Sequence, residues 1–147
     1  MADTLITGTT LIEDKRSEKG NIWSCPGISF VSDNPDTDQQ RNSSLSGYKT
    51  ADADGLSFTA PIELPNGVVI KKVIVWGNPG ATAETWALVR AENNTLSTRN
   101  TMATAVIGTE DETVDFATVD NSTYRYFLNA VSLDTNDIIY GARIIYE

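Results

Sequence analysis

One segment of the chain is apolar on both of its faces, and it constrains the fold more than any other. It follows a turn at residues 64–67, where Pro65 fixes φ and Gly67 accepts the backbone angles of a chain reversal. The next ten residues, VVIKKVIVWG, place apolar side chains at odd and even positions, and Lys71 and Lys72 interrupt them. A strand with two apolar faces is expected at the centre of a sheet that is covered on both sides. Residues 68–77 are therefore predicted to be the core strand of an all-β protein.

Strand-like segments recur along the rest of the chain at spacings of roughly eight to twelve residues. Several alternate apolar and polar side chains, as half-buried strands do, and turns rich in Asp, Asn, Gly and Pro separate them. These segments are residues 21–32, divided at Pro26 and Gly27, and residues 56–62, 84–91, 101–108, 113–119, 123–133 and 138–146. The sequence thus predicts a single-domain antiparallel β-sandwich, jelly-roll-like, of about nine or ten strands over residues 21–147.

Residues 1–20 are predicted to form a separate N-terminal arm. A polar tether of mixed charge, residues 13–20, separates a short apolar strand from the body of the protein. Such a strand either adds to the sheet edge of another subunit or pairs within its own chain. The first alternative predicts a homo-oligomer or a larger protein assembly, with an interface formed by Leu5, Ile6, Leu11 and Ile12.

The composition excludes several classes of function. The net charge of −9 argues against nucleic acid and anionic membranes as partners. The chain has no histidine, which removes the commonest general base, the usual zinc ligands and every Ser-His or Cys-His nucleophile pair. The single Cys25 cannot form an internal disulfide and is expected to be buried as a small hydrophobic residue. We therefore expect neither an enzyme nor a bound cofactor.

The N-terminal residues lack the charged-then-apolar order of a signal peptide, and no apolar run approaches the length that spans a membrane. The sequence therefore predicts a soluble product made without an export signal, and no membrane partner.

Acidic residues gather in residues 33–55, the least regular part of the chain. This long segment is also the first place where we expect a binding surface. Calcium takes six to eight oxygen ligands, and an EF-hand loop carries Gly at its sixth position and Glu at its twelfth. The spacing here departs from that pattern, and the chemistry of turns accounts for acidic residues without a metal. The calcium candidates are Asp33, Asp36, Asp38, Asp52 and Asp54.

Aromatic and basic side chains supply the remaining candidates. Trp23 is the candidate for stacking on a ligand, because Trp76 and Trp86 lie on strands that are expected to be buried. Lys71 and Lys72 point to opposite faces of the core strand, so at least one must reach the rim or pair with an acid. A contact between one of these lysines and a carboxylate of another subunit is a further interface prediction.

Three motifs carry a resemblance that covers residues 56–147. They are the turn and core strand from Phe58 to Trp76, the YRYFL motif at residues 124–128, and IIYGARIIY at residues 138–146. This part of the chain resembles a β-sandwich or jelly-roll structural module found in uncharacterised bacterial and phage virion-associated proteins. The resemblance implies a structural role without catalysis.

Together these observations predict a non-enzymatic structural protein that self-assembles, such as a capsid decoration, tail or fibre subunit in a virion, or another extracellular surface assembly. The alternative is a carbohydrate-binding β-sandwich module or an adhesin, which would use exposed aromatic side chains and residues 33–55. A calcium-dependent adhesin is a third hypothesis.

Overall fold

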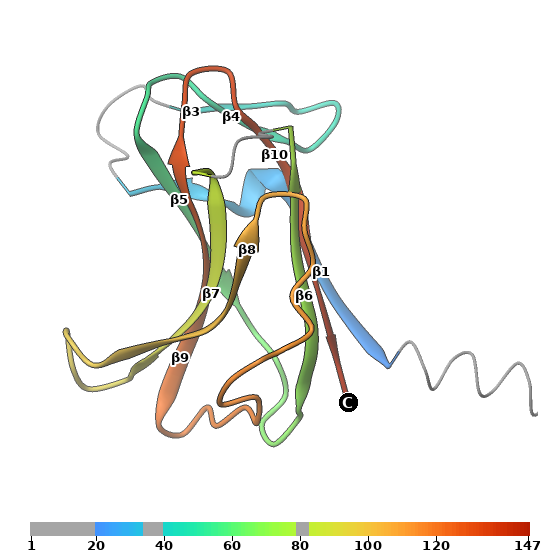
Figure 1. Ribbon diagram of the computed structural model, residues 1–147, viewed down its shortest axis with the longest axis vertical. Helices are drawn as coiled ribbons and strands as arrows, with labels where there is room; N and C mark the ends of the chain where they lie inside the picture. The colour runs from blue at the N-terminus through green and yellow to red at the C-terminus, as the bar shows by residue number, and fades with distance from the viewer. Residues whose placement is uncertain (1–19, 34–39, 79–82) are drawn as a thin grey trace, which may run out of the picture.

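The chain folds into two antiparallel β-sheets that pack face to face, as the computed structural model shows (Figure 1). The structure describes residues 20–33, 40–78 and 83–147. Sheet A contains β1 (Asn21–Pro26), β3 (Gln40–Asn42), β4 (Lys49–Ala51), β6 (Ile70–Gly77) and β10 (Ile138–Tyr146). Sheet B contains β2 (Val31–Ser32), β5 (Leu56–Ile62), β7 (Thr85–Glu92), β8 (Arg99–Val106) and β9 (Tyr124–Leu133). The predicted single-domain β-sandwich is confirmed.

The central strand of sheet A is β10. It pairs with β6 along one edge and with β1 and then β4 along the other. The prediction that residues 68–77 lie at the centre of the sheet is therefore wrong. The outer edge of β6 contacts an irregular segment, residues 108–119, and the Val73 N–H donates to the Asp111 carbonyl at 3.0 Å.

Sheet B has the order β2-β5-β9-β7-β8, and its longer strands lie within two residues of their predicted bounds. The predicted strand at residues 113–119 is wrong. The described backbone there forms one isolated bridge, between Thr118 and Val69 just before β6, in place of a ladder, and Phe116 has a φ of 53°. A φ in the left-handed region interrupts the regular extended backbone at that residue.

The core lies between the two sheets and is formed by alternate side chains of the long strands. Trp86, Phe58, Leu128 and Ile144 are among its largest fully buried members. Each such side chain contributes roughly 1.5–3 kcal/mol by leaving water. The Trp86 indole N–H donates to the Thr109 carbonyl at 2.9 Å, so its one polar atom is satisfied. Because side chains fill the interior, binding surfaces are to be sought on the outer faces.

The described part of residues 33–55 is more regular than the sequence indicates. β3 pairs with β4, and β4 joins the end of β10. Lys49 is buried on β4, and its Nζ donates to Gln40 Oε1 at 3.0 Å. Burial lowers the pKa of Lys49.

Some predictions fall on residues that the structure does not describe. The N-terminal arm up to residue 19, with Leu5, Ile6, Leu11 and Ile12, lies outside the described residues, and so do Asp36 and Asp38. Within the described ranges, no helix has the length and hydrophobicity needed to cross a membrane.

Candidate functional site

The outer face of sheet A carries an exposed tryptophan. Val73 and Val75 of β6 point into the core, so Trp76 points outward, and 37% of its surface is exposed. The expectation that Trp76 belongs to the core is therefore corrected. The alternation of side chains places Trp76 and Val75 on opposite faces of the strand. Because both faces are apolar, the sequence does not show which of them points into the core.

A second exposed aromatic residue lies beside Trp76 on β10. Trp76 is paired with Gly141, and a β-bulge between Ile139 and Gly141 places Tyr140 at this point of the ladder. Without the bulge, Tyr140 would point into the core on the same side as Ala142. Because of the bulge it points outward, and 50% of its surface is exposed. Gly141 is required here, since a Cβ atom would lie 2.6 Å from the Cys25 carbonyl oxygen.

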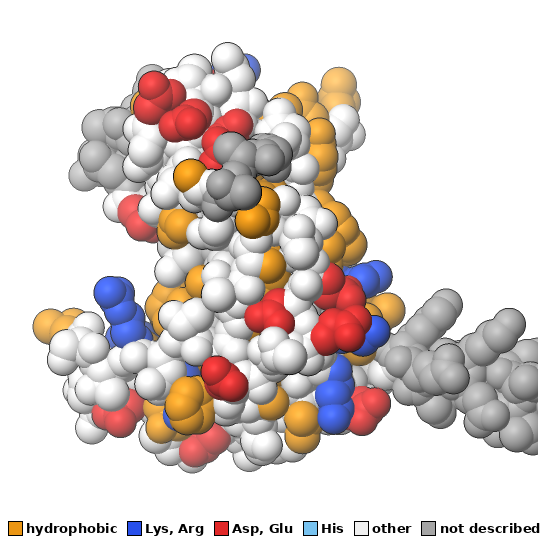
Figure 2. Space-filling view, in the orientation of Figure 1, with side chains coloured by type: hydrophobic (Ala, Val, Ile, Leu, Met, Phe, Trp, Pro, Cys, Tyr) orange, Lys and Arg blue, Asp and Glu red, His pale blue; other side chains and the backbone are white. Residues whose placement is uncertain are grey.

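Tyr48 extends this aromatic surface toward β4. The rings of Tyr48 and Tyr140 meet edge to face, with centroids 6.5 Å apart and an interplanar angle of 87°. We call Tyr48, Tyr140 and Trp76 the aromatic face. In Figure 2, hydrophobic side chains run along the side of the molecule on which sheet A lies in Figure 1. Tyr48 comes from residues 33–55, where the sequence predicted a binding surface.

Charged side chains border the aromatic face in matched pairs. The Arg143 guanidinium lies 5.3 Å from the centroid of the Trp76 ring, and its Nη2 donates to Glu110 Oε2 at 3.1 Å. These two contacts hold the guanidinium in place and orient its remaining N–H groups. The Lys72 Nζ atom lies 3.2 Å from Glu112 Oε1. The border thus offers hydrogen-bonding groups with little net charge.

Lys71 and Lys72 both find partners within the chain. Lys71 Nζ lies 3.9 Å from Glu147 Oε2, and Lys72 pairs with Glu112. The sequence predicted that at least one of them reaches the rim or pairs with an acid, and both lysines pair with an acid. The contact of either lysine with another subunit stays a prediction.

Trp23 and Cys25 lie on the inward side of β1. Both are partly buried and pack against the core. Burial raises the pKa of the Cys25 thiol to about 11, although hydrogen bonds with Ala142 and Ser29 lower it in part. Trp23 therefore offers less surface for stacking on a ligand than its sequence context indicates, and Trp76 replaces it as the candidate.

The described calcium candidates serve separate turns rather than one site. Asp33 Oδ1 accepts a hydrogen bond from Thr59, and Asp52 Oδ1 accepts one from Arg41. Asp54 accepts from the backbone and the hydroxyl of Thr135, and these bonds lower the pKa of Asp54. The structure therefore does not bring these three described carboxylates together.

A different set of acids comes together at the end of the sandwich. Glu84, Asp134 and Asp137 each place one carboxylate oxygen within 4.8 Å of the others. Oxygen ligands of this kind suit a hard divalent cation. Asp137 Oδ2 also accepts the Asp134 N–H at 2.7 Å, so this carboxylate is part of the turn itself. Sequence analysis missed the cluster because Glu84 lies about fifty residues away from its partners.

Sequence analysis also missed the components of the aromatic face. Glu110 and Arg143 are far apart in the chain, and their side chains meet because residues 108–119 follow the edge of β6. The exposure of Tyr140 depends on a bulge that alternation does not reveal.

Comparison with known proteins finds similar solved structures but no matching sequence. No protein-family model and no curated protein sequence matches the chain. The C-terminal CBM6, a carbohydrate-binding module, of a marine laminarinase from Zobellia galactanivorans is 17% identical, with a TM-score of 0.45, over 85% of this chain and 99% of that one. A GH26–CBM35 β-(1,4)-mannanase from Podospora anserina is 11% identical, with a TM-score of 0.44, over 88% of this chain and 28% of that one.

These comparisons overturn the first functional prediction. These two similar structures bear the names of carbohydrate-binding modules, so the virion component, with its capsid, tail and fibre variants, is corrected in favour of the alternative. At such low identity and TM-score the likeness carries no argument about the ligand of this chain. The ligand and its position must be argued from the residues of this chain.

Proposed function

We propose that this protein is a non-catalytic carbohydrate-binding module that holds a sugar ring against Trp76 on the aromatic face. The observation that supports the proposal is the exposure of the Trp76 indole beside Tyr140 on an ordered sheet. Exposed aromatic groups that lie together are uncommon on a protein surface without a partner. Trp and Tyr supply a large rigid contact area and lose little conformational entropy on binding.

The chemistry of a sugar fits this surface in two ways. One face of a pyranose ring presents C–H groups, which pack on the electron-rich face of an indole and leave water as they do so. Its hydroxyl groups point outward around the ring, where they can exchange hydrogen bonds with the Arg143 N–H groups and the Glu110 carboxylate. Because Arg143 is already held by Trp76 and Glu110, binding orders few additional side chains.

The proposed ligand at this face is a neutral glycan. Arg143 is paired with Glu110 and Lys72 with Glu112, so the border carries no unmatched charge from these four residues. A charged sugar would have to compete with one of the existing pairs, whereas a hydroxyl group can add to them.

The absence of catalysis is part of the same proposal. Glycoside hydrolysis uses two carboxyl groups that flank the scissile bond, one of which must deliver a proton. Glu110, which binds the Arg143 that packs on Trp76, and Glu112, which binds Lys72 on the same strand as Trp76, are each paired with a cation. The aromatic face therefore offers binding groups without a free acid.

The test is a glycan array followed by calorimetry on the best neutral glycan. Trp76→Ala should weaken binding roughly 30-fold or more, the loss expected for a central aromatic contact. Leu96→Ala is the matched control. Leu96 is a fully exposed apolar residue outside the aromatic face, so its truncation should leave binding unchanged. Unaltered affinity in Trp76→Ala, or no binding to any neutral glycan on the array, would overturn the proposal.

A further inference from the structure

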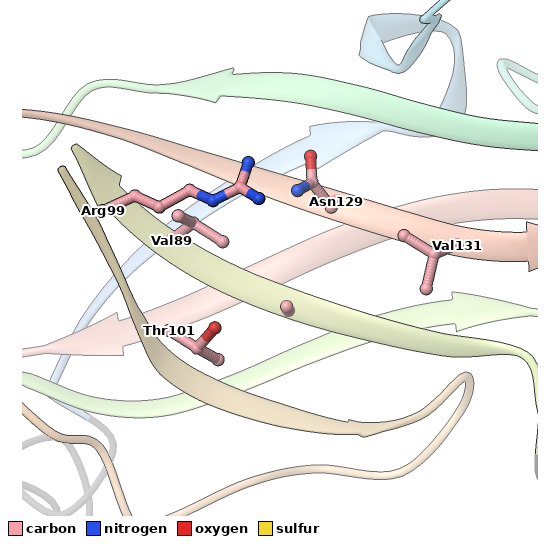
Figure 3. A pocket seen from close by; sticks show the side chains of 6 residues that line it. Val89, Arg99, Thr101, Asn129 and Val131 are labelled. Carbon is pink, nitrogen blue, oxygen red and sulfur yellow. The ribbon is translucent and has the colours of Figure 1, made fainter. Parts of the chain in front are cut away.

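The outer face of sheet B contains a hollow of about 220 Å³ (Figure 3). Its floor is made by the small side chains of Ala87 and Val89 on β7, and polar side chains rise beside them from β8 and β9. The residues that line it are Ala87, Val89, Arg99, Thr101, Asn129 and Val131. The hollow is thus an apolar floor with a few polar groups directed over it, an arrangement typical of small-ligand sites.

Arg99 differs from the other described arginines. Within the described ranges, its guanidinium has no hydrogen-bond, ion-pair or ring partner, although it reaches over Val89 toward Asn129 (Figure 3). The remaining described arginines all have partners for their side chains, namely Arg41, Arg90, Arg125 and Arg143. Arg99 therefore keeps its full set of donors for a ligand.

Asn129 adds a second donor on the same side. The Thr59 hydroxyl lies 2.9 Å from Asn129 Oδ1 and 2.9 Å from Asp33 Oδ1. The single hydroxyl proton of Thr59 is shared between these two oxygens, and in this orientation the carboxamide nitrogen of Asn129 faces Arg99 (Figure 3). The hollow has no carboxylate among its lining residues. The Asp33 carboxylate joins the hollow only through the Thr59 hydroxyl, so the lining itself carries one charge, the cation of Arg99, and favours an acceptor-rich anion in a protein of net charge −9.

We propose that this hollow binds the carboxylate group of an acidic sugar, a uronate unit of a glycan. Arginine forms two parallel hydrogen bonds to a carboxylate, and Asn129 can donate to the ring oxygen or a hydroxyl beside it. The volume is below the roughly 300–1,000 Å³ typical of pockets for drug-sized ligands, so it accommodates about one ring and not a nucleotide cofactor. The C–H face of that ring packs against the partly exposed Ala87 and Val131 side chains.

The sheet itself argues against a peptide as the ligand. Peptides commonly bind sheets by adding a strand to an unpaired edge. β7, which forms the floor, is paired along both edges, with β8 on one side and β9 on the other. The hollow therefore offers side chains alone, which suits a ring with exocyclic polar groups.

This inference goes beyond the proposed function, because it assigns a second site with a different ligand to the opposite sheet. The two sites share no residue. If the proposal for one site fails, the proposal for the other site is unaffected, and separate experiments test the two.

The probe is an oligogalacturonate together with the same oligomer after chemical reduction of its carboxyl groups, with an oligomer of glucuronate treated in the same way. Calorimetry should show binding of the acidic oligomer and loss of roughly tenfold or more affinity in its reduced counterpart, the usual difference for charge-assisted hydrogen bonds. Backbone amide shifts in an NMR titration should concentrate on β7, β8 and β9. Binding of the acidic form should weaken as salt is raised.

Variants complete the test. Arg99→Gln should lower affinity for the acidic oligomer at least tenfold, and Arg99→Lys should lose less because it keeps the charge without the planar fork. Arg41→Gln is the matched control, because it removes a cation from sheet A. The proposal is overturned if neither uronate oligomer binds, if the reduced forms bind equally well with amide shifts on β7, β8 and β9, or if Arg99→Gln binds as the unaltered protein does.

Discussion

The two outer faces of this sandwich share one core but differ in chemistry. The face of sheet A presents large aromatic side chains and charges that are already paired, with Arg143 bound to Glu110. The face of sheet B presents small side chains around a hollow, and Arg99 at its side has no partner among the residues that the structure describes. Because side chains alternate along a strand, the inward residues can keep the fold while the outward ones specify each surface independently. The comparison indicates that the inward residues determine the fold and that a few outward residues determine which ligand each face binds.

The sharpest way to test this division between inward and outward positions is to truncate one tryptophan of each kind. Trp86 is completely buried, and Trp86→Ala should cost about 3–5 kcal/mol of unfolding free energy, because it leaves a cavity and an unpaired Thr109 carbonyl. Trp76→Ala should cost about 1 kcal/mol, in the range of mutations outside the core. Denaturant unfolding followed by circular dichroism measures both. Equal losses of stability would contradict the placement of Trp76 on the outer face.

The sequence predicts the strands of this fold better than it predicts which side of each strand is inside. Residues 56–62 and 138–146 form strands with the predicted bounds because turn residues delimit them and their apolar side chains alternate. Residues 113–119 show the same alternation but bend away at Phe116, since their hydrogen bonds go to the edge of β6 and to Asp111. Alternation alone does not report which backbone partner is available.

The candidate sites were less predictable for a related reason. Trp76 lies in a strand that is apolar on both faces, so its sequence context suits either side of the sheet. Tyr140 leaves the core through a bulge, and the partners of Arg143 are set by the tertiary fold. The hollow beside Arg99 exists because β7 carries Ala87 where a larger residue would fill the space. Such properties arise from the pairing of distant segments, which the sequence does not encode locally.

A variant with a smaller expected effect tests whether the paired charges on sheet A contribute to ligand binding. Arg143→Gln removes the ion pair with Glu110 and the contact with the Trp76 ring while it keeps a shorter polar side chain. Affinity for the neutral glycan should fall about fivefold, and stability should change by less than about 1 kcal/mol, because the pair is partly exposed. Calorimetry with Lys71→Gln as the control, which breaks the pair with Glu147, separates this loss from a general effect of charge. A loss as large as that of Trp76→Ala would contradict the supporting role of Arg143.

The last expected effect depends on pH and concerns Asp111, which links the edges of the two sheets. Its backbone pairs with Val73 of β6, and its carboxylate accepts the N–H of Thr104 on β8 at 3.0 Å and both the N–H and the hydroxyl of Thr113. Burial raises the pKa of Asp111, but these hydrogen bonds lower it by more, so the net pKa lies below its ordinary value of 3.8.

A carboxyl group whose pKa is lower in the folded state contributes stability above its unfolded pKa, and that contribution is lost as the pH falls through the folded value. Asp111→Ala should therefore cost about 1 kcal/mol at pH 7. The difference from the unaltered protein should shrink as the pH falls below 3.8. Urea unfolding at pH 7 and pH 3 measures this, with Glu63→Ala as an exposed control for the change in net charge. A difference that stays constant between the two pH values would show that neutral contacts, rather than the carboxylate, join the edge of sheet A to sheet B.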